Sequence, residues 1–202
     1  MTEQNIVDHK PTELATFHSM EDGTEADWGI IATQTIHHFV GLPERLMTHL
    51  NLLNSDFGGF AVDRLTHSLQ TATRAERDNR DDEYIFCALM HDIGDTLGPA
   101  NHADIAATIL RPFVSDQNHW MVEKHGIFQG YYFFHYLGLD RDLREQFRGE
   151  PWFDYTAEFC SEYDGPSFDP DYPTLPLAHF EPLIRSQVAT AKRSLYSKAL
   201  EE

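Results

Sequence analysis

Positive charge is scarce in this sequence, with 15 Lys and Arg residues against 33 Asp and Glu residues and a formal net charge of −18. A surface of this sign repels the phosphates of nucleic acids and of anionic membranes. We therefore expect no nucleic-acid partner and no membrane partner. The expected partner is a small-molecule substrate, and the same acidity would tolerate a cationic ligand. Nothing in the sequence specifies an oligomeric state.

Cysteine is also rare, since the chain has only Cys87 and Cys160. The two form no Cys-x-x-Cys or zinc-knuckle spacing, which excludes a disulfide scaffold and a cysteine-rich zinc module. No apolar run approaches membrane-spanning length, and no basic-then-apolar leader opens the chain. A glycine-rich dinucleotide fingerprint is missing as well. These absences predict a cytoplasmic enzyme that does not use NADH.

Apolar residues recur with helical spacing along most of the chain, and no stretch has the alternation of a strand. The prediction is an all-α fold, with a loosely ordered segment at 1–24 and one helical domain at 25–202 that begins with a helical extension. Asp27 is predicted to cap the first helix. The predicted helices are Trp28–Val40, one from Pro43, one through His67, one ending at His91 and Asp92, one from Asn101, one from Ser115 or Asp116 to His125, Asp140–Arg148, Pro151–Asp164 and one from Ala178.

The chain is organised around the stretch from Ile85 to Gly94, where an apolar run ends in His91 and Asp92. Burying such a pair costs free energy unless both side chains have partners, and metal ions are common partners. Further candidate ligands lie on or beside predicted helices on either side of the pair: His67, His102, His125 and Asp164. One helical bundle could turn all six side chains inward.

This ordered set resembles the HD-domain superfamily, whose pattern is H…HD…H…H…D, over roughly Phe57 to Phe180. The resemblance implies a single HD-domain helical bundle with two metals. It would assign the ligands as follows: His67, His91 and Asp164 to one metal, His102 and His125 to the other, and Asp92 to both as the bridging, catalytic carboxylate. The segment His67-Ser68-Leu69-Gln70 is similar to the mixed-valent diiron oxygenases that cleave organophosphonates, to which myo-inositol oxygenase is a distant relative.

Four histidines and two carboxylates suit Fe, Mn, Co or Zn better than Mg or Ca. The resemblance implies two iron ions, Fe(II) and Fe(III), with O2 as co-substrate. Redox-inert metals would instead favour a phosphohydrolase, in which a bridging hydroxide attacks a phosphate ester. A metal-stabilised binding or regulatory module is a third reading. The oxygenase is favoured because few basic residues stand near the ligands.

The positions that bind substrate in the phosphonate-cleaving enzymes differ here. Gln129 replaces a Lys, Asp95 a His and Ser161 an Arg, while Phe57 and Phe60 replace a gating Tyr and Glu. The nearest basic residues are Arg64 and Lys124. These seven residues form the predicted substrate-binding set. The expected substrate is a small hydroxylated compound, such as a 1-hydroxy organophosphonate with an ammonium head, cleaved at its C–P bond with release of phosphate.

Three other features have two readings each. The aromatic segment from Tyr131 to Tyr136 packs between helices or places rings at the site. The proline-rich loop at 165–176 covers the site or simply connects two helices. His37, His38 and His49 are read as packing or surface residues.

Overall fold

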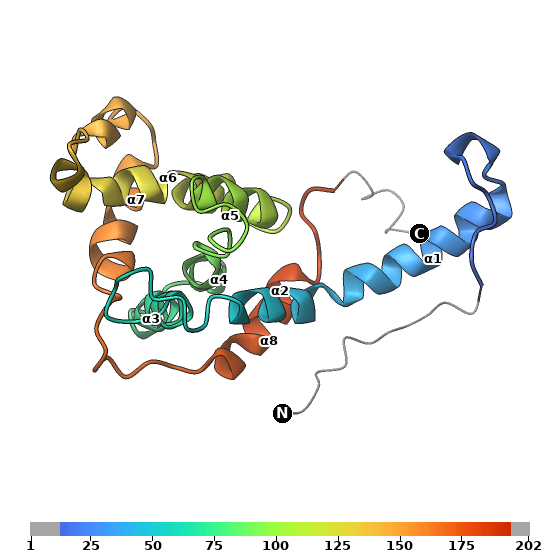
Figure 1. The fold of residues 1–202 in the computed structure, drawn as a ribbon, viewed down its shortest axis with the longest axis horizontal. Helices are drawn as coiled ribbons and strands as arrows, with labels where there is room; N and C mark the ends of the chain where they lie inside the picture. The colour runs from blue at the N-terminus through green and yellow to red at the C-terminus, as the bar shows by residue number, and fades with distance from the viewer. Residues whose placement is uncertain (1–12, 195–202) are drawn as a thin grey trace. The chain divides into compact units, whose positions relative to one another are not determined.

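The structure is a computed structural model that describes residues 13–194 (Figure 1). Within this range every regular element is a helix, which confirms the predicted all-α fold. No helix among these residues has both the length and the apolar character needed to cross a membrane. Contacts divide the chain into two compact units with the boundary between Leu42 and Pro43. That boundary falls inside the segment 25–202, which the sequence analysis treats as one domain.

The first unit contains a short 3-10 helix, η1 (Met20–Asp22), and the helix α1 (Glu25–Val40). Thr24, not Asp27, is the N-cap of α1. The Asp27 backbone N–H donates to Thr24 Oγ1 (3.3 Å), and the Thr24 N–H donates back to Asp27 Oδ2 (3.0 Å). This reciprocal capping box satisfies two N–H groups that the helix leaves unpaired, so α1 begins before the predicted Trp28.

Residues 13–24 have specific contacts with α1, although the sequence predicted a loosely ordered segment at 1–24. The Thr16 N–H donates to Asp27 Oδ1 (2.8 Å), and the Phe17 ring lies 5.3 Å from the Trp28 ring. Residues 1–12 of the predicted segment lie outside the described residues.

The second unit is a helical bundle. Its α-helices are α2 (Leu42–Asn51), α3 (Arg64–Arg77), α4 (Asp82–Met90), α5 (His102–Leu110), α6 (Asp116–Phe133), α7 (Phe153–Glu158) and α8 (Leu177–Val188). The 3-10 helices η2 (Phe134–Leu137) and η3 (Leu143–Phe147) follow α6, and the π-helix η4 (Phe159–Asp164) continues α7. Helix α4 is buried along its length from Tyr84 to Met90 and packs against α3, α6 and α8 (Figure 1). An apolar helix of this kind is a core element of the bundle.

Side-chain caps set where the ligand-bearing helices begin. Asp63 accepts a hydrogen bond from the Thr66 N–H (2.7 Å) at the start of α3, and Asp81 accepts one from the Tyr84 N–H (2.8 Å) at the start of α4. Ser115 opens α6 in the same way. Asn101, predicted to cap the next helix, stands at the start of α5 without a side-chain cap bond.

Two glycines allow close backbone approaches beside the candidate ligands. A Cβ on Gly94 would lie 2.3 Å from the His102 carbonyl oxygen, and a Cβ on Gly165 would lie 2.6 Å from the Cys160 carbonyl oxygen. Both distances are too short for any other residue. Gly94 therefore lets the start of α5 approach the turn after α4. Gly165 permits its own N–H to bond Cys160 O (2.9 Å), five residues back, at the end of the π-helix.

Two predicted elements differ in form. Helix α6 continues past the predicted end at His125, through Gly126 and Gly130, to Phe133, because interior glycines weaken a packed helix without ending it. The predicted helix at 140–148 is the short 3-10 helix η3.

Candidate metal centre

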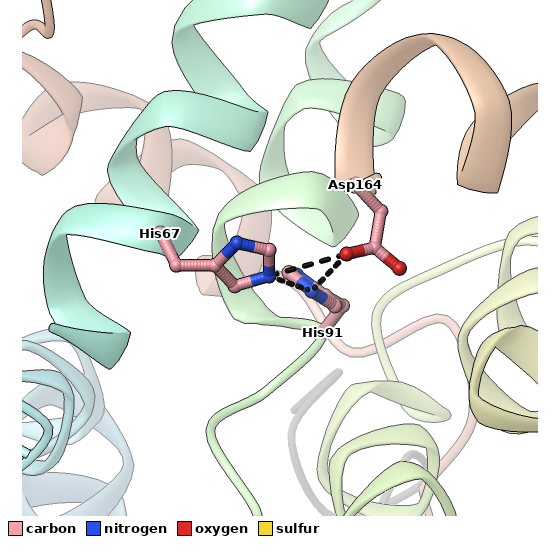
Figure 2. A group of neighbouring side chains, drawn as sticks. All are labelled: His67, His91 and Asp164. Carbon is pink, nitrogen blue, oxygen red and sulfur yellow. Dashed lines mark hydrogen bonds and ion pairs between the residues drawn. The ribbon is translucent and has the colours of Figure 1, made fainter. Parts of the chain in front are cut away.

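Three of the predicted ligands come together from three different elements. His67 lies in the first turn of α3, His91 directly follows α4, and Asp164 is the last residue of η4 (Figure 2). His67 Nε2 lies 3.1 Å from His91 Nε2 and 3.2 Å from Asp164 Oδ1, and His91 Nε2 lies 3.6 Å from the same oxygen. All three side chains are buried, and the group could hold a metal ion.

The other three predicted ligands form an adjoining group. His102 Nε2, from the start of α5, lies 3.2 Å from His125 Nε2 on α6. Both nitrogens face Asp92 Oδ1, at 3.4 Å from His102 and 3.3 Å from His125. The set His91, Asp92 and His125 could also hold a metal ion.

Asp92 stands between the two groups. Its Oδ1 faces His102 and His125, and its Oδ2 lies 3.5 Å from the Nε2 atoms of both His67 and His91. Each carboxylate oxygen is therefore directed to one pair of imidazoles. Asp92 therefore adjoins both groups of histidines.

The hydrogen bonds of the ring Nδ1 atoms test whether the histidines suit metal ions. His67 Nδ1 bonds the Ser167 carbonyl (3.0 Å), His91 Nδ1 the Ala88 carbonyl (2.8 Å) and His125 Nδ1 the Val122 carbonyl (2.7 Å). A carbonyl oxygen only accepts, so each Nδ1 carries the proton and each Nε2 of a neutral ring presents a lone pair.

The consequence for His67 and His91 is a pair of Nε2 atoms 3.1 Å apart whose lone pairs are directed at one another. Such contacts are repulsive unless a cation lies between them. In addition, Asp164 Oδ2 is buried without a hydrogen-bond partner within the described residues. Buried, unpartnered oxygen and nitrogen acceptors of this kind fit a metal centre.

The pKa shifts of the clustered carboxyl and imidazole groups also favour binding of a cation. Burial opposes ionisation of Asp92 and Asp164, but the surrounding imidazoles hold the pKa of both carboxyls well below the usual range. Burial lowers the pKa of His67 and His91, but the carboxylates of Asp164 and Asp92 raise it by more. Both carboxylates are thus ionised at neutral pH and attract positive charge to the cluster.

Two members of the predicted substrate-binding set contact predicted metal ligands. Asp95 is buried and forms an ion pair with Arg64, and its Oδ1 lies 3.4 Å from His102 Nδ1. Burial and the nearby Asp92 raise the pKa of the Asp95 carboxyl. Gln129 donates through Nε2 to Asp164 Oδ1 (2.8 Å). Such outer partners orient ligands and tune a metal site.

Among the described residues, the side chains of Arg64, Lys124 and Ser161 bond to groups other than the six ligands. Arg64 is occupied by Asp95 and also lies 3.4 Å from Asp56. Lys124 pairs with Glu123 (3.0 Å) and lies over the Phe147 ring. Ser161 is exposed and bonds to groups of its own helical segment. Phe57 and Phe60 are each 50% exposed.

Ser167 and Phe168 of the loop at 165–176 adjoin the centre, and the sequence had left open whether this loop covers the site without naming either residue. The Phe168 ring stacks on His67 with centroids 4.2 Å apart, and Phe60 stacks on Phe168 at 4.6 Å. Gln70 fixes the loop, because its side chain donates to the Asp169 carbonyl (2.7 Å) and accepts from the Asp169 N–H (3.3 Å). Gln70 follows His67 by three residues, so helical spacing alone puts them on neighbouring faces. No pattern in the sequence indicated that Gln70 would bond to Asp169 in this loop.

The family model described as HD domain matches residues 64–148. An HD domain is therefore found in this part of the chain, as the ligand pattern predicted. The match includes five of the six predicted ligands and ends before Asp164. HD-domain proteins are generally metal-dependent enzymes, and the domain suggests a superfamily of metal-dependent hydrolases of the phosphohydrolase type. A search of curated proteins gave no match to this chain.

The Gln129–Asp164 bond leads to a first prediction. Replacing Gln129 with leucine removes the donor that orients Asp164 Oδ1 while keeping a side chain of similar size. We expect metal affinity to fall about 10–100-fold, as is typical when an outer partner of a ligand is lost. Competition with a chelator measures the affinity. Gln117→Leu, on the same helix and away from the ligands, should leave the metal affinity unchanged. Equal losses of affinity in both variants would show that the Gln129–Asp164 bond does not contribute to metal binding.

Proposed function

We propose that the chain is a two-metal HD-domain enzyme whose native metals are iron and whose co-substrate is O2. The observation that carries the proposal is the placement of Asp92, with one carboxylate oxygen toward each pair of histidines. In this reading His67, His91 and Asp164 bind one ion. His102 and His125 bind the other, and Asp92 bridges the two.

The protein's own groups prepare this centre. The carbonyls of Ser167, Ala88 and Val122 fix three imidazoles with Nε2 directed inward, so little reorganisation is needed when the metals bind. Phe168 covers one face of His67 and keeps water from that side. A pair of iron ions held in this way would supply the redox capacity to couple O2 reduction to oxidation of a bound substrate.

The choice of iron rests on donor type. Four imidazoles and two carboxylates form a mixed nitrogen and oxygen set, which suits Fe, Mn, Co or Zn better than Mg or Ca, and the resemblance carried by His67-Ser68-Leu69-Gln70 favours iron among these. The positive charge expected beside a phosphate ester is also limited near the ligands. Arg64 is paired with Asp95 and Asp56, and Lys124 is paired with Glu123.

The proposed substrate is a small hydroxylated acid, and a 1-hydroxy organophosphonate is the first to test. In that reaction one O2 converts the hydroxyl-bearing carbon to a carboxylic acid and releases phosphate. The C–H and C–P bonds break, both oxygen atoms of O2 enter the products, and O2 accepts all four electrons. The reaction therefore needs no external reductant.

Oxygen consumption and phosphate release test this proposal directly. The iron-loaded protein should consume one O2 for each phosphate formed from 1-hydroxy-2-(trimethylammonio)ethylphosphonate or from its primary-amine analogue. Oxygen uptake with another hydroxy acid and no phosphate would reject C–P cleavage and retain the oxygenase.

The second candidate function is metal-dependent phosphate-ester hydrolysis, which the HD-domain match itself favours. The same oxygen experiment separates the two. Turnover of phosphomonoesters without oxygen, together with no oxygen uptake on any hydroxy acid, would replace the oxygenase with a phosphohydrolase.

A further inference from the structure

A pair of arginines beyond the metal ligands lies against one tyrosine. The guanidinium carbon of Arg144 is 3.8 Å from the centroid of the Tyr131 ring, and that of Arg141 is 4.1 Å from it. The Nε atoms of both arginines are buried and have no hydrogen-bond partner within the described residues. Two guanidinium groups thus lie against one tyrosine ring, and each has an Nε–H donor without a partner among the described residues.

The two arginines lack a dedicated counter-ion. Within residues 13–194 Arg141 forms no ion pair, and Arg144 reaches Glu145 only at 3.9 Å. Glu145 is engaged more closely by Arg148, at 2.6 and 2.8 Å. Two like charges on one ring repel each other, and in a chain with 33 acidic residues this pairing is unusual. A bound anion would relieve the repulsion.

Helix α6 connects this pair to the candidate metal centre. His125, Gln129 and Tyr132 are spaced by four and three residues and share one face of the helix. Burial raises the pKa of the Tyr132 hydroxyl, and the nearby Arg144 guanidinium opposes that rise. Arg144 is also close enough to oppose the burial-driven rise in the pKa of the Cys160 thiol. Arg144 is therefore near the Tyr131 ring, at 3.8 Å, and near Tyr132, which shares a helix face with His125.

We propose that Arg141 and Arg144 form an anion subsite that binds a carboxylate or phosphoryl group at the far end of the substrate. As a statement about substrate this rests on the proposed function, whereas anion binding by the two arginines does not. Two guanidinium forks suit the planar or tetrahedral oxygens of such a group. They would repel an ammonium head, so this inference favours a substrate with an acidic far end over the ammonium-bearing phosphonates of the first test.

The geometry of α6 sets the scale of that substrate. At 1.5 Å per residue, Tyr132 lies about 10 Å along the helix from His125. A molecule that reaches both the centre and the arginines therefore carries its hydroxyl and its second acidic group several bonds apart. A hydroxylated acid with a remote carboxylate or phosphoryl group meets this requirement.

The test measures the NMR signals of the arginine Nε–H groups while inorganic phosphate, and separately succinate, is added to the full-length protein. The experiment is done on metal-loaded protein and again after chelator treatment, since phosphate also binds metals. We expect the Arg141 and Arg144 signals to move in both preparations. R144Q and R141Q should each weaken anion binding about ten- to hundredfold, the usual scale for loss of a charged hydrogen bond.

Matched variants separate recognition from general charge and from misfolding. R144K keeps the charge and loses the fork, so it should bind more weakly than wild type and more tightly than R144Q. R111Q removes a charge from an exposed arginine elsewhere and should bind normally. Unchanged arginine signals on adding either anion, or equal binding by R144Q and R111Q, would overturn the subsite. Normal anion binding in a protein without oxygen uptake would reject the proposed reaction and retain the anion subsite.

Discussion

Replacing Asp92 with asparagine is expected to reduce the metal content from two ions per chain to one or none and to abolish turnover. Each oxygen of Asp92 faces two histidine Nε2 atoms, at 3.3 to 3.5 Å. Asparagine keeps the size of the side chain but replaces one of these oxygens with an amide NH2 group, which donates hydrogen bonds and cannot act as a metal ligand. The loss of affinity should exceed the roughly 10–100-fold effect of losing an outer partner.

Elemental analysis and activity measure this result, and circular dichroism checks that the helices persist. Asp104→Asn is the matched control, because Asp104 is an exposed carboxylate in the first turn of α5, two residues from His102. That variant should bind both metals and turn over normally. Full metal content in Asp92→Asn would mean that Asp92 does not bridge.

Removal of the metals is expected to lower the melting temperature and to reverse its dependence on pH. Each bound ion stabilises the folded state by about 2.7 kcal/mol when present at a hundred times its dissociation constant. Metal binding needs neutral imidazoles, so the metal-loaded protein should become more stable as pH rises through the histidine range.

The metal-free protein should behave in the opposite way. Burial lowers the pKa of His67 and His91, but Asp164 and Asp92 raise it by more, so the folded values lie above the unfolded ones. Their contribution to stability is complete below the unfolded value of about 6.5 and is lost as pH rises through the folded values. The depressed pKa values of Asp92 and Asp164 add stability above about pH 4, which is lost as pH falls further.

Thermal unfolding with and without chelator, near pH 6 and near pH 8, measures both effects. We expect chelation to cost more stability at the higher pH. Identical melting curves with and without chelator at both pH values would contradict a metal bound at these residues.

The sequence predicted the helical fold because the apolar residues of the bundle recur at helical spacing, most clearly in α4, which is buried from Tyr84 to Met90. The order of histidines and aspartates also predicted which side chains would come together. His67, His91 and Asp164 are up to 97 residues apart in the chain, yet they meet at distances of 3.1 to 3.6 Å.

The surroundings of the ligands could not be predicted in the same way. Only the three-dimensional contacts show that Gln129 bonds to Asp164 and that Asp95 lies beside His102. The same contacts show that the charge of Arg64 is neutralised by Asp95. The π-helix that ends at Asp164 depends on the close approach of Gly165 to Cys160 O, which no spacing rule reveals. The boundary after Leu42 likewise follows from packing and left no mark in composition.

The contacts of the loop at 165–176 were hidden for a similar reason. Phe168 stacks on His67 and the Ser167 carbonyl accepts from His67 Nδ1, although about a hundred residues separate them. Short-range periodicity carries no information about such a pairing. The loop is fastened to α3 by Gln70 and by Arg74, which donates to the Pro166 carbonyl (2.8 Å).

The most direct test of the two-metal centre is the iron content and EPR spectrum of the full-length protein loaded anaerobically with iron and then partly oxidised. A two-metal centre predicts close to two irons per chain and the signal of a coupled Fe(II)/Fe(III) pair, both lost in Asp92→Asn and both kept in Asp104→Asn. A single iron per chain with only an isolated Fe(III) signal would contradict it.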